Sequence, residues 1–187
     1  MIVLVGGCCA GKTTLLDVLV YKFGYDRLTT YTTRPPRKGE LEGVDYHFIT
    51  NEQFDKLNKD GFFAETTSYN VASGETWKYG TSKEDLEPNK IVILNPYGLK
   101  EMRKDKSLNI VAFYLFASHG EIWNRLRKRG DSSDEAARRI EADKKDFEDI
   151  LEYIDFSINT NGCFSVEETA EIIDMVYERS KHASSKA

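Results

Sequence analysis

The spacing of apolar residues predicts that the chain opens with a strand, a turn and a helix. Residues 1–5 form a continuous apolar run that is rich in β-branched side chains and ends at a pair of glycines. Such a run is typical of a buried parallel strand. From residue 11 to residue 23 the apolar positions recur at helical spacing, and Gly24 supplies a stop signal. We therefore predict a strand that leads through a glycine-rich turn into a helix.

The alternation of strand and helix returns in the second half of the chain. The predicted strands cover residues 90–94, 109–116 and 156–158. The predicted helices cover residues 99–104, 121–128, 134–153 and 166–177. Strands that alternate with helices along a chain form a parallel sheet with helices packed on its faces. The predicted fold class is thus α/β, with a three-layer core around a parallel sheet.

Residues 29–87 have a different texture. Short β-prone segments alternate with turns, at residues 28–32, 46–49, 62–67 and 76–80. One short helix is predicted over residues 51–59, with Asn51 as its N-cap and with Phe54 and Leu57 facing inward. This mixture predicts a small α+β insertion in the parallel core.

Composition and charge limit the partners of the chain. Its 187 residues suffice for one domain with a smaller insertion. A net charge of −5 argues against a nucleic-acid partner, because neutralising phosphates requires a basic face. There is no apolar run of about 18 residues, so no membrane span is expected, and residues 1–5 lack the basic leader of a signal peptide. The three cysteines, an odd and low number, fit a reducing compartment, so we expect a cytoplasmic protein.

The turn after the first strand matches a phosphate-binding motif. The run GGCCAGKT at residues 6–13 fits the pattern G-x-x-x-x-G-K-[ST]. Glycines allow the backbone to curl until successive N–H groups point at phosphate oxygens, and the following helix adds its positive end. Lys12 can reach the β- and γ-phosphates of ATP, and the Thr13 hydroxyl can ligate Mg²⁺, the expected cofactor. The residues predicted to bind ATP in this loop are Gly6, Gly7, Cys8, Cys9, Ala10, Gly11, Lys12, Thr13 and Thr14.

A second motif supplies groups for a monophosphate. Residues 32–48 contain the runs TTRPPRKGE and GVDYHF. Arg34 and Arg37 carry planar guanidinium groups that suit a dianionic phosphate. The phenol groups of Tyr46 and Tyr79 can donate hydrogen bonds to the same phosphate. The segment therefore predicts an acceptor that carries a terminal phosphate.

These residues resemble the signature of the guanylate kinases. The family pattern T-T-R-x-P-R-x-G-E, then x-x-G-x-D-Y-x-F, is complete here, and Glu65 and the run YGT at residues 79–81 follow in order. The resemblance extends from the phosphate-binding loop to about residue 159. It implies transfer of the γ-phosphate of ATP to GMP or dGMP. Glu65 can accept hydrogen bonds from N1–H and the exocyclic amine of guanine, two donors that adenine lacks.

The resemblance also implies roles for further side chains. Thr30 and Thr81 fall where the family places small hydroxyls that face the guanine. Glu40 falls where the family has an acidic residue that orders the arginines, and Asn159 matches a position near the donor adenine. The residues expected to bind GMP are Thr30, Arg34, Arg37, Glu40, Tyr46, Glu65, Tyr79 and Thr81.

A cluster of arginines follows the strand predicted at residues 109–116. The run RLRKRG at residues 125–130 and the pair Arg138-Arg139 would by themselves fit a solvated basic patch or a nucleic-acid contact. They are similar to the R-x-x-x-R-G segment and lid of guanylate kinases, which implies that arginines here close over the phosphates. Cationic groups supply most of the catalysis in phosphoryl transfer. The residues expected to act in catalysis are Lys12, Arg34, Arg125, Arg129 and Arg139.

The resemblance divides the chain into parts of one guanylate-kinase-like domain. The core is expected at residues 1–28, 88–124 and 140–180, the monophosphate-binding insertion at residues 29–87 and a short helical lid at residues 125–139. The insertion and the lid are expected to close on binding, because an open site would hydrolyse ATP. The expected partners are ATP and GMP or dGMP, with no nucleic acid and no membrane, and the chain is expected to be a monomer or a homodimer.

One segment departs from the family pattern. The second core strand of guanylate kinases ends in an aspartate, whereas this chain has Asn95 followed by Pro96. Asn95 could order a Mg²⁺-bound water through its carbonyl oxygen, but it brings no charge. The departure leaves room for another acceptor, such as a different monophosphate or a ribose bisphosphate. A binding module without turnover and a nucleic-acid-acting ATPase are the remaining alternatives.

Overall fold

A computed structural model describes the backbone of residues 1–70 and 74–184 and the side chains of these residues up to residue 181. The strands are β1 (Ile2–Gly6), β2 (Asp26–Arg27), β3 (Tyr31–Thr32), β4 (His47–Phe48), β5 (Phe63–Asn70), β6 (Thr76–Ser82), β7 (Lys90–Ile93), β8 (Val111–Phe116) and β9 (Phe156–Asn159). The helices are α1 (Lys12–Phe23), α2 (Asn51–Lys59), α3 (Pro96–Met102), α4 (His119–Arg129), α5 (Ser133–Asp146) and α6 (Val166–Ser184), with a 3₁₀ turn, η1, at Ile150–Glu152. None of the helices in this part of the chain combines the length and the apolar character needed to cross a membrane.

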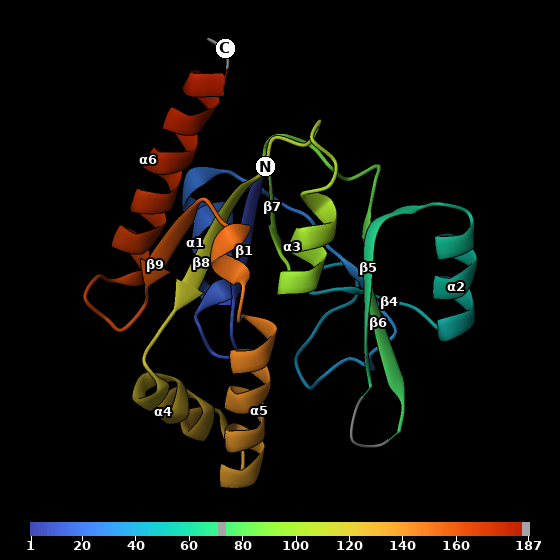
Figure 1. Cartoon of the computed structure of the whole chain (residues 1–187), viewed down its shortest axis with the longest axis horizontal. Coiled ribbons are helices and arrows are strands. Elements are labelled where there is room, and N and C mark those ends of the chain that lie inside the picture. The colour runs from blue at the N-terminus through green and yellow to red at the C-terminus, as the bar shows by residue number, and fades with distance from the viewer. Residues whose placement is uncertain (71–73, 185–187) are drawn as a thin grey trace.

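The core is a parallel sheet in the order β2-β7-β1-β8-β9 (Figure 1). β1 is its central strand and is buried on both faces, as its continuous apolar sequence predicts. Ile2 and Leu4 pack against α1 and α6, and the alternate residues Val3 and Val5 pack against α3 and the segment around Ile150. Helices therefore cover both faces of the sheet, and the predicted three-layer α/β core is confirmed.

The predicted insertion forms a sheet of its own. Its order is β4-β3-β6-β5, with β3 and β4 parallel and the other pairs antiparallel. α2 covers this sheet, and Phe54 stacks on Phe63 with ring centroids 4.6 Å apart. In Figure 1 this unit lies beside the core, with α2 on its outer side. The mixed α+β character predicted for this segment is confirmed.

Three element boundaries differ from the predictions. The strand predicted at residues 28–32 is two strands, because β2 joins the core sheet and β3 joins the second sheet. α2 is capped by Thr50 rather than by Asn51, since Thr50 and Gln53 form a reciprocal capping box. The helix predicted over residues 99–104 begins earlier, at Pro96, which is a favourable first residue of a helix, and ends at Met102.

The long helix predicted over residues 134–153 is wrong in its second half. α5 ends at Asp146, and the next residues form the turn η1. Phe147 leaves the helical line to stack on Tyr114, with ring centroids 5.4 Å apart, and Ile150 is buried against the core sheet. Burial of Phe147 and Ile150 favours the end of the helix at Asp146, because a continued helix would not place Ile150 against the core sheet.

Candidate active site

The phosphate-binding loop joins β1 to α1 and bends sharply. Gly11 has a φ of 91° and Cys9 a φ of 53°, so both adopt left-handed backbone conformations. Gly6 has no room for a side chain, because a Cβ there would lie 2.4 Å from the carbonyl oxygen of Leu115. The loop is therefore a tightly curled backbone held against β8, as its motif predicts.

Lys12 begins α1, and its side chain folds back over the loop. Its Nζ donates to the carbonyl oxygens of Gly6 and Gly7 at 2.7 Å each. Burial lowers the pKa of Lys12, while the nearby carboxylate of Asp143 acts in the opposite direction. The ammonium group is thus held against the backbone of the loop.

A cavity of about 750 Å³ opens beside this loop, and we call it the donor cavity. Residues of the loop, the acceptor segment, α4, α5 and the segment after β9 all reach it. Its lining includes residues 8–14 together with Arg37, Arg125, Arg129 and Arg139. Four arginines and Lys12 thus lie around one cavity, and side chains of this kind suit the phosphate groups of a nucleotide.

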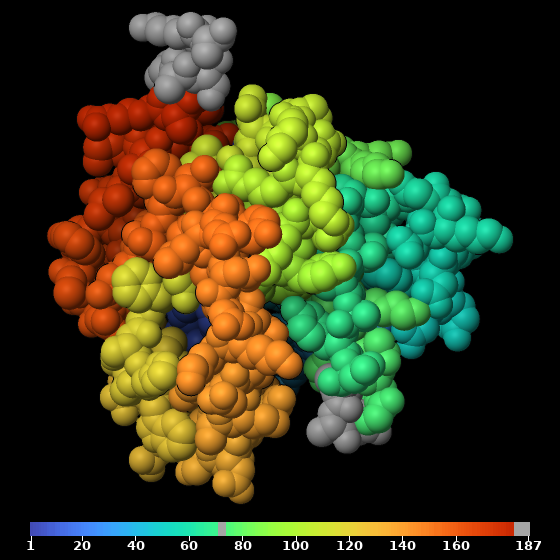
Figure 2. All heavy atoms as spheres, viewed as in Figure 1, coloured from blue at the N-terminus to red at the C-terminus, as the bar shows by residue number. Residues whose placement is uncertain are grey.

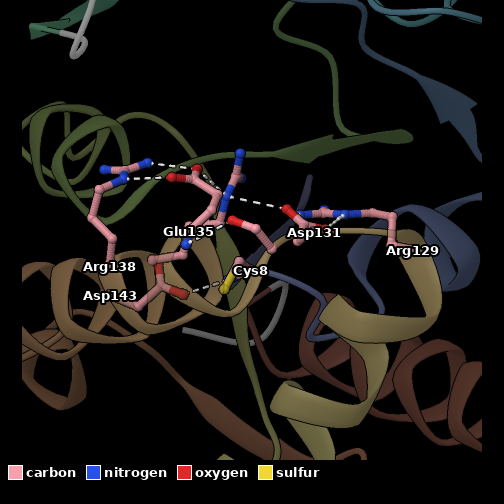
Figure 3. A network of polar contacts seen from close by, with 8 residues as sticks. Cys8, Arg129, Asp131, Glu135, Arg138 and Asp143 are labelled. Carbon is pink, nitrogen blue, oxygen red and sulfur yellow. Dashed lines mark hydrogen bonds and ion pairs between the residues drawn. The ribbon is translucent and has the colours of Figure 1, made fainter.

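Three of these arginines are paired with carboxylates: Arg125 donates to Glu121 at 2.7 Å, and Arg129 and Arg139 have partners in residues 131–135 (Figure 3). Arg129 donates to both oxygens of Asp131, at 2.6 and 2.7 Å. Arg139 donates to Glu135 at 2.7 Å and lies 3.5 Å from Asp131. Arg138, which lies beside Arg139 in sequence, forms a bidentate pair with Glu135 and does not appear in the described lining of the donor cavity. Arg129 and Arg139 therefore both have carboxylate partners within the chain.

Arg125 ties the loop to the segment after β9. Its guanidinium donates to the carbonyl oxygen of Cys9 at 3.1 Å and to that of Thr160. Among the described residues Thr160 lines the donor cavity and Asn159 does not; the side-chain oxygen of Asn159 accepts the N–H of Asn161 at 2.9 Å. The segment after β9 thus reaches the donor cavity through Thr160, which follows the predicted residue Asn159.

The acceptor cluster is centred on Arg34, which is buried. It forms a bidentate ion pair with Glu40, at 2.8 and 2.9 Å, and its guanidinium lies 5.2 Å from the ring centroid of Tyr46. The rings of Tyr46 and Tyr79 are 6.1 Å apart. Burial opposes ionisation of Glu40, but its hydrogen bonds with Arg34 and with the N–H of Arg37 prevail and lower its pKa. The fold therefore brings together Arg34, Tyr46 and Tyr79, the side chains that were predicted to bind one phosphate.

Glu65 has one satisfied and one unsatisfied oxygen. Oε1 accepts the Thr81 hydroxyl at 2.6 Å, whereas the buried Oε2 has no partner within the described part of the chain. Burial raises the pKa of Glu65 to about 7, against the effect of the Thr81 hydrogen bond. A Cβ on Gly98 would lie only 2.9 Å from Oε2, so this glycine, which the sequence did not single out, leaves space for the carboxylate. Thr30 lies just before β3, and its carbonyl oxygen accepts the N–H of His47 at 2.9 Å.

Asn95 has structural partners for both ends of its carboxamide. Its Oδ1 accepts the N–H of Gly98 at 2.7 Å and caps α3, and its Nδ2 donates to the Thr67 hydroxyl at 2.9 Å. The residue therefore links the end of β7 to β5. The role of Asn95 in ordering a Mg²⁺-bound water stays a prediction, and its Oδ1 already accepts one hydrogen bond.

Asp143 is a functional candidate that the sequence did not reveal. It lies on α5, and its Oδ2 accepts the backbone N–H of Cys8 at 2.6 Å. A Cβ on Gly7 would lie 2.7 Å from the same oxygen. Nothing in the charge pattern of residues 134–153 distinguishes Asp143 from its acidic neighbours, so only the fold identifies it.

Comparison with known proteins places this geometry in a family. The sequence matches the family model described as guanylate kinase over residues 1–179. The guanylate kinase of Sulfurimonas denitrificans is 33% identical over 183 residues, which cover 92% of this chain and 85% of that protein. The guanylate kinase of Syntrophus aciditrophicus is 29% identical over 187 residues, which cover 99% of this chain and 88% of that protein.

The chain belongs to the guanylate kinase family. The predicted family is therefore confirmed, and the chain is a phosphotransferase. The fold agrees: the crystal structure of guanylate kinase from Anaplasma phagocytophilum superposes with a TM-score of 0.68 at 22% identity, covering 96% of this chain and 85% of that one. The YorR protein of Bacillus subtilis, solved in complex with phosphorylated GDP, superposes with a TM-score of 0.53 at 17% identity, covering 97% and 98% of the two chains.

Proposed function

We propose that this guanylate kinase family member transfers the γ-phosphate of ATP to GMP or dGMP. The position of Arg37 carries the proposal. Arg37 belongs to the acceptor segment, and its backbone N–H donates to Glu40, the partner of Arg34. Its side chain nevertheless lines the donor cavity together with Lys12. A phosphate at the loop and a phosphate at the Arg34 cluster would therefore meet at this arginine.

On the donor side, the loop amides, Lys12 and the arginines would hold the phosphates of ATP. The hydroxyl of Thr13, at the start of α1, lines the same cavity and is the side chain that would hold Mg²⁺. A hydroxyl oxygen is a hard ligand, which suits Mg²⁺. The metal would neutralise charge on the phosphates during transfer.

On the acceptor side, Glu65 would select the base. Its free Oε2 is a buried acceptor, and guanine offers two adjacent donors, N1–H and the exocyclic amine. Adenine offers neither and would leave the carboxylate without partners, which disfavours it strongly. Arg34, Tyr46 and Tyr79 would bind the phosphate of the acceptor. The family pattern and this geometry together favour GMP or dGMP over the other acceptors considered.

The transfer itself requires no nucleophilic side chain. An oxygen of the acceptor phosphate would attack the γ-phosphorus in line with the leaving oxygen, while the cations stabilise the charge that develops. For this, Arg129 and Arg139 would exchange Asp131 and Glu135 for phosphate oxygens. Catalysis would therefore consist of positioning, electrostatic stabilisation and exclusion of water.

Exclusion of water would require the insertion and the lid to close. Between the two sheets lies a cleft of about 870 Å³, lined by residues of α2, β5, β6, α3 and the end of α5. Figure 2 shows the surface hollowed between α5 and the second sheet. An open cleft between the two sheets supports closure of residues 29–87 and 125–139 toward the core when both substrates bind. Equal distances between labels on these parts, with and without both nucleotides, would contradict closure.

A coupled assay with ATP and a panel of acceptors tests the proposal. We expect turnover with GMP or dGMP and none above background with AMP or a ribose bisphosphate. Binding of ATP without any turnover would instead indicate a binding module. Hydrolysis that is stimulated by DNA or RNA would indicate the nucleic-acid-acting ATPase.

A further inference from the structure

The carboxylate of Asp143 lies where the phosphate-binding loop offers its backbone N–H groups. Oδ2 accepts the N–H of Cys8 at 2.6 Å and lies too close to Gly7 for that residue to carry a Cβ (Figure 3). A curled loop before a helix N-terminus is an anion-binding structure, and a carboxylate is an anion. Asp143 and Cys8 are 135 residues apart in sequence, so the tertiary fold alone brings this anion to the loop.

Other groups near the loop also have oxygens of the protein as hydrogen-bond partners. Lys12 donates to carbonyl oxygens of the loop itself, and Arg129 and Arg139 donate to Asp131 and Glu135. Lys12, Arg129 and Arg139 thus each donate to an oxygen of the protein. The three acceptor carboxylates, those of Asp131, Glu135 and Asp143, come from one short stretch that includes α5.

α5 also has space to move. A second cavity, of about 280 Å³, lies between α5 and the core and is lined by Tyr114, Ile140 and Phe147 together with Cys8 and Asp143. This pocket is open to solvent, so part of α5 has no packing partner there. The helix that carries Asp143 is therefore incompletely packed at the point where it meets the loop.

We propose that Asp143 is an internal competitor of the donor nucleotide. Its carboxylate occupies the phosphate-binding loop in the ligand-free chain, and a donor phosphate has to displace it. Because Asp143 and Arg139 share α5, its release would accompany the movement that presents Arg139 to the phosphates. This inference rests on the proposed use of the loop for ATP, and it adds a residue that lowers the affinity for the donor.

The test is calorimetric titration of ADP with Mg²⁺ into the full chain and its variants. The substitutions Asp143→Asn and Asp143→Ala remove the competing charge. The apparent dissociation constant is raised by the fraction of molecules that are not competent to bind, so a carboxylate that blocks nine-tenths of them predicts about tenfold tighter binding on its removal. Glu141→Gln is the matched control, because Glu141 is exposed, lies on the same helix and loses the same charge. It should bind ADP within about twofold of the wild type.

Each outcome decides the inference. Tighter binding by both Asp143 variants, with the control unchanged, supports it. Unchanged or weaker binding by Asp143→Asn overturns it, and a loss that requires Mg²⁺ would instead make Asp143 a partner of the bound metal. If none of the proteins binds ADP, the donor site itself is rejected. This result differs from ADP binding with the same dissociation constant in the wild type and in the Asp143 variants, which rejects only the role of Asp143. Amide hydrogen exchange provides a second measurement: the N–H of Cys8 should exchange faster in both Asp143 variants than in the control.

Discussion

The acceptor cluster and the donor cavity hold their arginines in opposite ways. Arg34 exposes 3% of its side chain and is locked by Glu40, only six residues away in the chain. Arg129 exposes 45% of its side chain, and its partner Asp131 lies in the segment between α4 and α5. Arg34 thus lies in a buried pair, whereas Arg129 lies in a pair that is half-exposed to solvent. The two pairs therefore differ in burial rather than in sequence distance, and a half-exposed pair can open at a lower cost than a buried one.

The largest effect should follow from removing the cation at the loop. Lys12→Ala should lower kcat about a thousandfold or more, because a fixed charge at the transferred phosphate is lost. The fold should persist, since the Nζ of Lys12 contacts two carbonyl oxygens of the same loop. Circular dichroism and the coupled assay measure the two properties. Undiminished turnover in this variant would remove the loop from the donor site.

Because one arginine pair is buried and the other is half-exposed, removing Arg34 should lower both stability and activity, whereas removing Arg129 should lower mainly activity. Arg34→Ala leaves Glu40 without its partner, so it should lower the free energy of unfolding by roughly 3 kcal/mol as well as kcat/KM. Arg129→Ala should change stability by less than about 1 kcal/mol, because its pair is half-exposed and Asp131 keeps Arg139 nearby. Both variants should lower kcat/KM by at least about a hundredfold. Urea unfolding and turnover would be measured on both, and equal losses of stability would refute the contrast.

Recognition of the base should depend on pH through Glu65. Guanine donors require the ionised carboxylate, and with a pKa of about 7 its ionised fraction falls about tenfold between pH 8 and pH 6. The KM for GMP should rise by about the same factor over this range. Glu65→Gln, which keeps every other titrating group, should remove this dependence and narrow the preference for GMP over AMP. A pH profile of KM that is the same in both proteins would exclude Glu65 from base recognition.

The raised pKa of Glu65 also predicts how stability depends on pH. Affinity for GMP should increase with pH, whereas the free energy of unfolding should decrease. Folding favours the neutral form of Glu65, so its contribution is complete below pH 4.5 and is lost as the pH rises through 7. The ligand-free wild type should therefore lose stability between pH 5 and pH 8 relative to Glu65→Gln. Urea midpoints of the two proteins across this range measure the difference, and parallel curves would speak against a buried carboxylate.

The smallest effect concerns the space beside Glu65. Gly98→Ala would place a Cβ 2.9 Å from Oε2 and should displace the carboxylate, raising the KM for GMP about fivefold. Gly120→Ala is the matched control, because a Cβ there meets no atom within 4 Å. The control should leave KM unchanged. If both variants have the KM of the wild type, Gly98 has no role in placing Glu65.

Local sequence was sufficient for the features that depend on neighbouring residues. The strand, loop and helix at residues 1–23 follow from apolar spacing and a motif whose groups act within eight positions. The pairing of Arg34 with Glu40 is local for the same reason, and the resemblance to guanylate kinases located it. Glu65 was also identified from the sequence, although its unsatisfied oxygen is visible only in the structure.

Tertiary structure alone decided the features that depend on packing between distant segments. α5 ends at Asp146 because Phe147 and Ile150 find buried partners, which the helical pattern does not contain. Asn95 caps α3 and bonds to Thr67, a contact between two sheets. Asp143 reaches Cys8 across 135 positions, and no local rule predicts which carboxylate of a charged helix faces the loop. Apolar spacing thus determined the fold class, and local motifs predicted the two phosphate sites, whereas long-range packing decided which side chains lie against those motifs.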